Sequence, residues 1–212
     1  NRVTGHRDGI YFEFVTDSKI TGNHSEGNIR YGLHFMFSNS NEYRHNTFIA
    51  NGAGVAVMYS AKVHMEANRF LRNWGPSSYG LLLKDIRDSE VRGNLFDHNT
   101  TGIYMEGSSR IQFPENIFRG NGWALRIQAS CDGNVFSDSD FFANTFDVAT
   151  NGTLVLNTFR SNYWDKYDGY DLDRDGIGDV PCHPVSVYSM VVERMPAAML
   201  LLRSLARFRS VT

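Results

Sequence analysis

The chain is 212 residues long, with a formal net charge of -2 and a hydrophobic fraction of 42%. This length and apolar content are sufficient for a continuous hydrophobic core, and the 19 glycines indicate a chain rich in turns. A near-neutral charge without a basic stripe excludes the electrostatic surface that nucleic-acid binding needs, so we expect no nucleic-acid partner.

A repeat of about 22 residues starts near the N-terminus. Each unit opens with a small residue and continues with alternating apolar residues, and every unit that opens with Gly has an Asn fourteen residues after it. A second Asn follows five residues later, and a Phe comes two residues after the first Asn in most units. The opening residues are Gly9, Gly32, Gly54, Gly80, Gly102 and Ala124, and the first asparagines are Asn23, Asn46, Asn68, Asn94 and Asn116.

This repeat predicts an all-β fold, a single-stranded right-handed parallel β-helix built from stacked coils. Apolar residues alternate with period two, which excludes helical repeats, and coils stacked about 4.8 Å apart place equivalent residues over one another. We expect the asparagines at corners, where they adopt left-handed backbone angles and bond to one another along the row. The three predicted internal rows are Ile10/Leu33/Val55/Leu81/Ile103/Leu125, Phe12/Phe35/Val57/Leu83/Met105/Ile127 and Ile20/Tyr43/Met65/Val91/Phe113/Val135.

The repeat weakens after Phe136, where residues 131–140 form a degenerate turn. The Asn-x-Phe pattern then returns at Asn144 and Phe146, and again at Asn157 and Phe159. We therefore place the parallel β-helix over residues 1–162. Because the first residue already lies inside the pattern, we expect an N-terminal cap and any signal peptide upstream of it.

Two cysteines, Cys131 and Cys182, are present. A disulfide between them would fix the C-terminal segment to the last coils, and two free thiols are an equally good interpretation. Their spacing does not fit a pair of metal ligands.

An acidic segment over residues 163–183 follows the coils. Aspartates at alternate positions followed by Gly176 form the first half of a calcium loop, in which carboxylate oxygens converge on a hard cation. Position 12 of the loop is Cys182 rather than Glu, so the loop is not a complete EF-hand; an acidic turn without metal is the alternative. The predicted ligands of this structural calcium ion are Asp171, Asp173, Asp175, the carbonyl oxygen of Ile177, and Asp179.

The C-terminal tail, residues 184–212, contains a predicted helix over residues 187–208. Pro196 should kink this helix or restart it. The helix either caps the open end of the β-helix or docks on a partner, including one in a membrane; its apolar run is too short to span a membrane itself. The residues predicted to share its apolar face are Val191, Met195, Ala198, Leu202 and Leu205.

The residues two and four positions after each opening residue should point outward from the first strand of the coil. Among them, His34, Met36 and Met58 form a candidate copper site, because an imidazole with thioethers suits Cu(I). The alternative is an exposed apolar patch on which a partner docks. The predicted partner-binding residues are Tyr11, Leu82 and Tyr104 on this face and Val191, Met195 and Leu202 in the tail.

Parallel β-helices include enzymes that cleave or epimerise polysaccharides, and such sites need clustered carboxylates. Glu13 and Glu106 are four coils apart, about 19 Å, and cannot act on one bond. Lys84 and Glu106 lie on adjacent coils and should form a surface ion pair. We therefore expect a protein that is not an enzyme; the alternative is a carbohydrate-binding or carbohydrate-modifying (lyase- or epimerase-like) β-helix protein.

The Asn-x-Phe coils, the segment 162–181 (NYWDKYDGYDLDRDGIGDVP) and the segment 184–199 (PVSVYSMVVERMPAAM) together resemble the NosD family. Members of that family are periplasmic accessory proteins for maturation of the copper centre of nitrous-oxide reductase. The resemblance implies a periplasmic location and four partners: the membrane subunit and the ATPase of an ABC transporter, a copper chaperone, and the reductase. It also implies that the tail from Pro184 onward grips the membrane subunit. The resulting prediction is a non-catalytic scaffold and copper-delivery protein.

Overall fold

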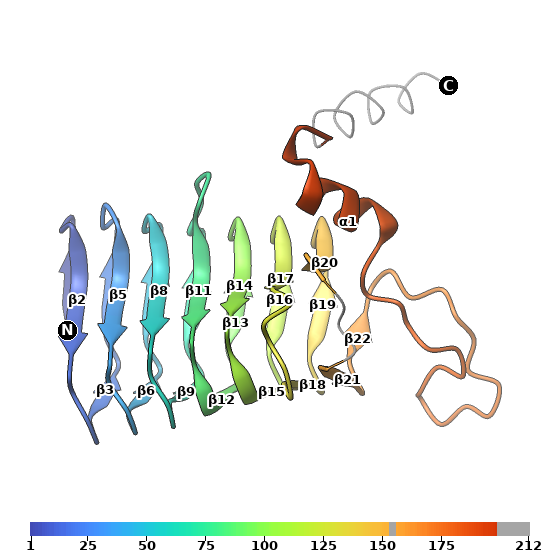
Figure 1. The fold of residues 1–212 in the computed structure, drawn as a ribbon, viewed down its shortest axis with the longest axis horizontal. Helices are drawn as coiled ribbons and strands as arrows, with labels where there is room; N and C mark the ends of the chain where they lie inside the picture. The colour runs from blue at the N-terminus through green and yellow to red at the C-terminus, as the bar shows by residue number, and fades with distance from the viewer. Residues whose placement is uncertain (153–155, 199–212) are drawn as a thin grey trace.

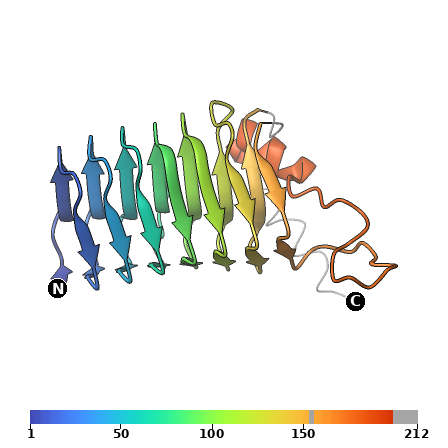
Figure 2. The ribbon, with the colours of Figure 1, turned by 90° about the horizontal axis from the view of Figure 1, so that it is seen from below.

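The computed structural model describes residues 1–152 and 156–198. The chain winds into stacked coils. Each strand pairs in parallel with the strand three positions earlier in the chain, so the strands form three parallel sheets. The coils follow one another along the long axis, and the N-terminus and helix α1 lie at opposite ends (Figures 1 and 2). The predicted all-β parallel β-helix with a short C-terminal helix is confirmed.

Each sheet is named here by its first strand. The β1 sheet contains β1 (Arg2–Thr4), β4 (His24–Glu26), β7 (Thr47–Ile49), β10 (Arg69–Leu71), β13 (Leu95–Asp97), β16 (Ile117–Arg119), β19 (Asp140–Phe142) and β22 (Tyr163–Trp164). The β2 sheet contains β2 (Asp8–Glu13), β5 (Tyr31–Met36), β8 (Ala53–Met58), β11 (Tyr79–Lys84), β14 (Thr101–Glu106), β17 (Trp123–Ile127) and β20 (Phe146–Thr150). The β3 sheet contains β3 (Lys19–Thr21), β6 (Glu42–Arg44), β9 (His64–Glu66), β12 (Arg87–Arg92), β15 (Ser109–Pro114), β18 (Val135–Ser137) and β21 (Thr158–Arg160). The chain then continues to α1 (Val187–Arg194) and the short 3-10 helix η1 (Pro196–Ala198).

The interior is filled by rows of equivalent residues, and the first two predicted rows pair in register from β2 to β17. The third row is correct as far as Phe113 and then wrong, because Phe113 pairs with Phe136 while Val135 pairs with Gln112. One extra residue in the corner after Ile127 shifts the register by one. Side chains alternate between the two faces of a strand, so this shift brings Phe136 into the core and leaves Val135 half-buried.

A second correction concerns the later Asn-x-Phe pairs. Ser139 occupies the first Asn row, where its Oγ accepts from the N–H of Asn116 at 3.0 Å. Asn144 instead extends the second Asn row, and Phe146 lies in β20. The internal stack of rings, with centroids 4.1 to 5.6 Å apart, therefore runs through Phe48, Phe70, Phe96, Phe118, Phe141 and Trp164.

The buried asparagines bond along their rows, as predicted. Asn68, for example, donates from its backbone N–H and from Nδ2 to Oδ1 of Asn94, at 2.9 and 3.0 Å. The predicted left-handed angles are not on the asparagines but on the residues that precede them, such as His45 (φ 54°) and Ala67 (φ 52°). The preceding residue takes the sharp turn and the Asn side chain points inward, where its amide satisfies buried backbone groups.

Helix α1 is shorter than predicted and packs through a different face. It ends at Arg194, just before Pro196, and the predicted helical residues 199–208, which include Leu202 and Leu205, lie outside the described residues. Val192 is 3% exposed, whereas Val191 and Met195 are 41% and 62% exposed, so these two do not share the buried face with Ala198. The buried face of α1 is the one that packs against Phe146 of β20.

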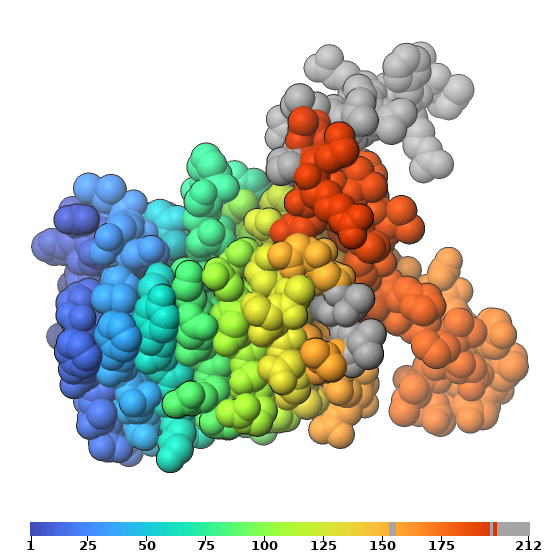
Figure 3. Space-filling model, viewed as in Figure 1, coloured from blue at the N-terminus to red at the C-terminus, as the bar shows by residue number. Residues whose placement is uncertain are grey.

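The segment before α1 closes the interior of the β-helix. Trp164 is buried at the end of the core, and Tyr167, Cys182 and Val185 pack against it. Val185 also forms a parallel bridge to Val148 in β20. The helix covers the edge and the outer side of β20, so the open end is capped by this segment together with α1 rather than by the helix alone (Figures 1 and 3).

Candidate functional site

The outward side chains of the β2 sheet form a face, called here the outer face, that carries the predicted copper residues. The register places Met36 directly beside Met58 and beside Glu13. It also places His34 between Tyr11 and Ala56. Strand pairing therefore brings the two thioethers to adjacent positions, with the imidazole two residues away on the same strand and the same face.

His34 is buried although it lies on the outer face. His34 is only 6% exposed, and neither of its ring nitrogens has a hydrogen-bond partner among the described residues. The rings of Tyr11 and Tyr31 cover it, with centroids 5.3 and 4.8 Å away. Burial, followed by the nearby Arg30 guanidinium, lowers the pKa of His34, which favours a neutral ring with a free lone pair. A buried imidazole without a hydrogen-bond partner is costly, which makes His34 a candidate functional residue.

The carboxylates around the outer face are all engaged within the part of the chain that the structure describes. Asp8 receives two hydrogen bonds from Arg30, at 2.7 and 2.8 Å, and Glu13 accepts from the Tyr11 hydroxyl at 2.9 Å. The predicted ion pair between Lys84 and Glu106 is present at 3.2 Å. None of these carboxylates is left free to act as a general acid or base without breaking a bond.

A ladder of three exposed aromatic rings lies beside the methionine pair and was missed by the sequence analysis. Phe14, Phe37 and Tyr59 stack with centroids 5.4 and 5.1 Å apart and are 73%, 42% and 43% exposed. Phe37 and Tyr59 directly follow Met36 and Met58 in the chain. The signal was available, because all three lie five residues after an opening Gly.

The predicted partner-binding residues differ in their accessibility. Tyr11 is 48% exposed, but Leu82 is only 9% exposed and offers little surface to a partner. Tyr104 is half-buried, with the Arg126 guanidinium 5.5 Å from its ring centroid. Val191 is exposed on α1, Met195 is exposed directly after the helix, and Leu202 lies outside the described residues.

At the other end of the molecule, the acidic loop brings three of its five predicted calcium ligands together. Gly176 makes the expected sharp turn with φ of +86°. Asp179 does not join the cluster, because its Oδ2 accepts from the backbone N–H of Leu172 at 2.7 Å. The carboxylates whose oxygen atoms lie within 4.8 Å of one another are those of Asp171, Asp173 and Asp175.

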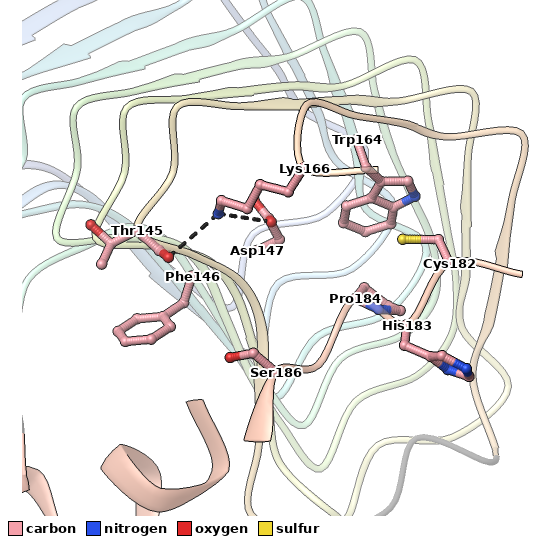
Figure 4. A pocket seen from close by; sticks show the side chains of 9 residues that line it. All are labelled: Thr145, Phe146, Asp147, Trp164, Lys166, Cys182, His183, Pro184 and Ser186. Atoms are coloured by element: carbon pink, nitrogen blue, oxygen red, sulfur yellow. Dashed lines mark hydrogen bonds and ion pairs between the residues drawn. The ribbon is translucent and has the colours of Figure 1, made fainter. Parts of the chain in front are cut away.

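A pocket of about 230 Å³ lies between β20, β22 and the segment that leads to α1 (Figure 4). Lys166 Nζ is 3.0 Å from Asp147 Oδ2 inside it; burial raises the pKa of Asp147, and Lys166 opposes this effect. Cys182 Sγ lies near Trp164, while the His183 ring points away. Cys182 and Cys131 are both free thiols, so the disulfide interpretation does not hold in this structure.

Two properties of residues 1–152 and 156–198 limit where a metal or a membrane could be bound. The acidic loop holds the one group of three or more His, Cys, Asp or Glu side chains close enough to share a metal ion. No helix in the described ranges combines the length and the apolar character that a bilayer crossing requires.

Solved structures with a similar fold include alginate epimerases and an alginate lyase. The A-module of mannuronan C-5 epimerase AlgE4 from Azotobacter vinelandii matches with a TM-score of 0.66 at 15% identity, covering 76% of this chain and 51% of that one. An alginate lyase from a Paenibacillus species matches with a TM-score of 0.54 at 14% identity, covering 73% of this chain and 68% of that one. At these identities the likeness shows the fold alone.

Sequence comparisons identify the family. A protein named "Probable ABC transporter binding protein NosD" from Pseudomonas aeruginosa is 30% identical over 209 residues, which are 95% of this chain and 36% of that protein. A protein of the same name from Stutzerimonas stutzeri is 27% identical over 167 residues, 70% of this chain and 38% of that protein. The chain thus spans little more than a third of these relatives. The sequence profile of the family described as "Periplasmic copper-binding protein (NosD)" matches residues 1–169, and the chain therefore belongs to the NosD family.

Proposed function

We propose that this chain is part of a periplasmic, non-catalytic accessory protein that serves maturation of the copper centre of nitrous-oxide reductase. Copper is its cargo rather than a resident cofactor. The observation that carries the proposal is His34, a buried imidazole without a hydrogen-bond partner on the face that also presents the Met36–Met58 pair.

The donor set suits Cu(I). Met36 and Met58 lie on adjacent strands about 4.8 Å apart, and His34 lies about 7 Å along the strand from Met36. Thioethers are soft ligands that select Cu(I), and a neutral imidazole is a good third ligand for it. These residues would hold the ion loosely, because Met36 and Met58 are only half-buried and a partner can reach them.

The scaffold role follows from two separate surfaces. The aromatic ladder Phe14, Phe37 and Tyr59 adds exposed apolar area beside the methionine pair, which suits docking of a copper chaperone or the reductase. The exposed Val191 of α1 and Met195 directly after the helix are available to the membrane subunit of an ABC transporter, whose ATPase would act from the opposite side of the membrane.

A Cu(I) titration of three variants in competition with a chromogenic chelator tests the cargo site. Met36→Ala/Met58→Ala should bind Cu(I) at least about tenfold more weakly than the wild type, because it loses two soft ligands. Met190→Ala/Met195→Ala is a matched control, since it removes two exposed methionines from α1 and the position after it and should leave the affinity unchanged. Equal binding by all three proteins would remove the site.

Pull-down with the separate partners tests the scaffold. The wild type should retain the copper chaperone and the transporter subunits, and Phe37→Ser/Tyr59→Ser should lose the chaperone alone. Loss of every partner at once, or of none, would contradict two separate docking surfaces.

A carbohydrate-binding or carbohydrate-modifying function is the second candidate, favoured by the tyrosines that line the outer face. Tyr79 and Tyr104 have ring centroids 5.2 Å apart, and rings of this kind can stack on sugars. The engaged carboxylates oppose catalysis. Incubation with alginate and polygalacturonate distinguishes the two functions: binding or unsaturated products would favour this candidate over copper.

The acidic loop is proposed to bind calcium as a structural ion. Three observations support this proposal: the clustered carboxylates, the sharp turn at Gly176, and the hydrogen bond that Tyr167 Oη donates to the Val180 carbonyl at 2.8 Å. A cation bound there would tie the loop together.

A further inference from the structure

We propose that Tyr11 is a gate over His34, held closed by Glu13, so that the imidazole becomes reachable only when Tyr11 swings away. This inference rests on the proposed copper function and adds regulation to the same site. The observation behind it is that both ring nitrogens of His34 are shut off from solvent by aromatic side chains rather than by hydrogen bonds.

The two rings that cover His34 are held differently. Tyr31 is half-buried, and the Arg30 guanidinium lies 4.9 Å from its ring centroid. Arg30 is itself fixed by two hydrogen bonds to Asp8. Tyr31 is therefore the fixed wall of the enclosure.

Tyr11 is the movable wall. It is 48% exposed, it meets the His34 ring edge-on at an interplanar angle of 63°, and its hydroxyl donates to the exposed Glu13 carboxylate at 2.9 Å. An exposed side chain held by one edge contact and one exposed hydrogen bond opens at low cost, because water replaces the hydrogen bond.

The register couples this gate to the methionine pair. Glu13 lies directly beside Met36 on the neighbouring strand. A cation arriving at Met36 attracts the Glu13 carboxylate, which weakens its bond to the Tyr11 hydroxyl. The methionines would therefore receive Cu(I) first, and His34 would become available as the third ligand afterwards.

Histidine modification by diethylpyrocarbonate, mapped by mass spectrometry on the metal-free chain, tests the gate without copper. Tyr11→Ala should raise the modification rate of His34 by about tenfold, because an aromatic edge contact no longer favours the closed state. Tyr11→Phe and Glu13→Gln weaken only the hydrogen bond between Tyr11 and Glu13. They should raise the modification rate of His34 by about two- to threefold.

Tyr104→Ala is the matched control, because it removes a tyrosine from the same face without touching His34, and the exposed His98 reports the reagent's activity in every sample. An unchanged His34 rate in Tyr11→Ala would overturn the gate. If that variant fails to fold, as judged by thermal unfolding, Tyr11→Phe and Glu13→Gln decide the question by the same criterion.

Stopped-flow Cu(I) uptake separates the gate from the copper proposal. Faster uptake by Tyr11→Phe than by the wild type, together with faster His34 modification, supports both. Faster modification in a chain that binds no Cu(I) supports the gate and overturns the cargo site. Normal Cu(I) binding with unchanged modification in all variants overturns the gate and leaves the cargo site standing.

Discussion

The two ends of the outer face are built from the same rows of outward residues, yet they differ in whether the polar side chains of those rows have a partner. At the C-terminal end, Arg126 occupies the row that holds His34 at the N-terminal end. Its guanidinium bonds to both carboxylate oxygens of Glu193 on α1, at 2.8 and 2.9 Å from Nη2, and lies 5.3 Å from the Trp123 ring centroid. His34 has no such partner.

This difference shows which end is complete within the described residues. Where α1 covers the face, the buried charge is paired and the apolar rings Phe146 and Tyr188 stack at 6.0 Å. Over β2, β5 and β8, the described residues leave the His34 imidazole without a hydrogen-bond partner, and they leave the methionine pair half-buried and the rings of the aromatic ladder exposed. A buried polar group without a partner calls for an explanation, and this is the physical argument behind the site proposed around His34.

The largest expected effect comes from breaking the complete end. Glu193→Ala leaves the Arg126 guanidinium without its carboxylate in a largely buried setting, which should cost about 2 kcal/mol of helix docking and speed amide exchange in α1 about 30-fold. Amide hydrogen exchange of the α1 residues measures this loss of helix docking. Glu115→Ala, which breaks the exposed pair with Arg92, should cost less than about 0.5 kcal/mol. Equal effects of the two variants would contradict a special role for the Glu193 contact.

Calcium should strengthen the same end. Adding Ca²⁺ should stabilise the native chain by about 1 to 3 kcal/mol at saturating concentration, and EGTA should reverse the shift in thermal unfolding. Asp171→Asn/Asp175→Asn should abolish the response, whereas Asp132→Asn/Asp138→Asn, which removes two exposed carboxylates elsewhere, should retain it. A wild type that ignores both Ca²⁺ and EGTA would mean that the loop is a metal-free acidic turn.

At the incomplete end, removing the polar group should stabilise the protein. His34→Leu eliminates two buried nitrogens without partners and should increase the free energy of unfolding by about 1 kcal/mol, while the copper affinity falls. Urea unfolding measures the first effect. His98→Leu is the control, because that side chain is 64% exposed and should give no gain. Destabilisation by His34→Leu would show that the ring has a structural role after all.

The smallest effect concerns two carboxylates whose pKa values move in opposite directions. Burial would raise the pKa of Asp8 at the N-terminal end, but hydrogen bonding to Arg30 outweighs it and the pKa is lowered. The stabilisation from Asp8 is therefore present above its ordinary pKa and lost as pH falls through the lowered value.

Burial raises the pKa of Asp147 at the C-terminal end, with Lys166 opposing it. Its contribution is fully present below the ordinary pKa and lost as pH rises through the raised value. Carboxylate NMR titrations should show Asp147 taking up its proton first on acidification, and Arg30→Gln should raise the pKa of Asp8 alone. Protonation in the reverse order would contradict the assigned environments.

Much of the β-helix could be predicted because its rules are local and repeated. Alternating apolar residues define the inner rows, and an Asn fourteen residues after each opening Gly defines a buried Asn ladder. The prediction failed after Ile127, where one additional corner residue changed the register and exchanged Val135 for Phe136. A pattern with period two cannot reveal such a shift when both residues are apolar.

The candidate site was predictable only in part. The adjacency of Met36 and Met58 follows from the repeat alone, because stacked coils place equivalent positions side by side. The enclosure of His34 does not, because it depends on how the rings of Tyr11 and Tyr31 settle around it. The same limit applies to α1, whose periodicity favoured Val191 while the β20 edge selected Val192.

By itself, the sequence determined the coil, its inner rows, its Asn ladders and the position of the acidic loop, because each of these repeats or depends on residues close together in the chain. Only the tertiary structure decided which outward groups find partners. The contact between Arg126 and Glu193 joins residues 67 positions apart. The burial of His34 depends on the rings of Tyr11 and Tyr31, which come from two strands. Burial and pairing depend on which side chains meet in the folded chain, and a local sequence pattern does not contain that information.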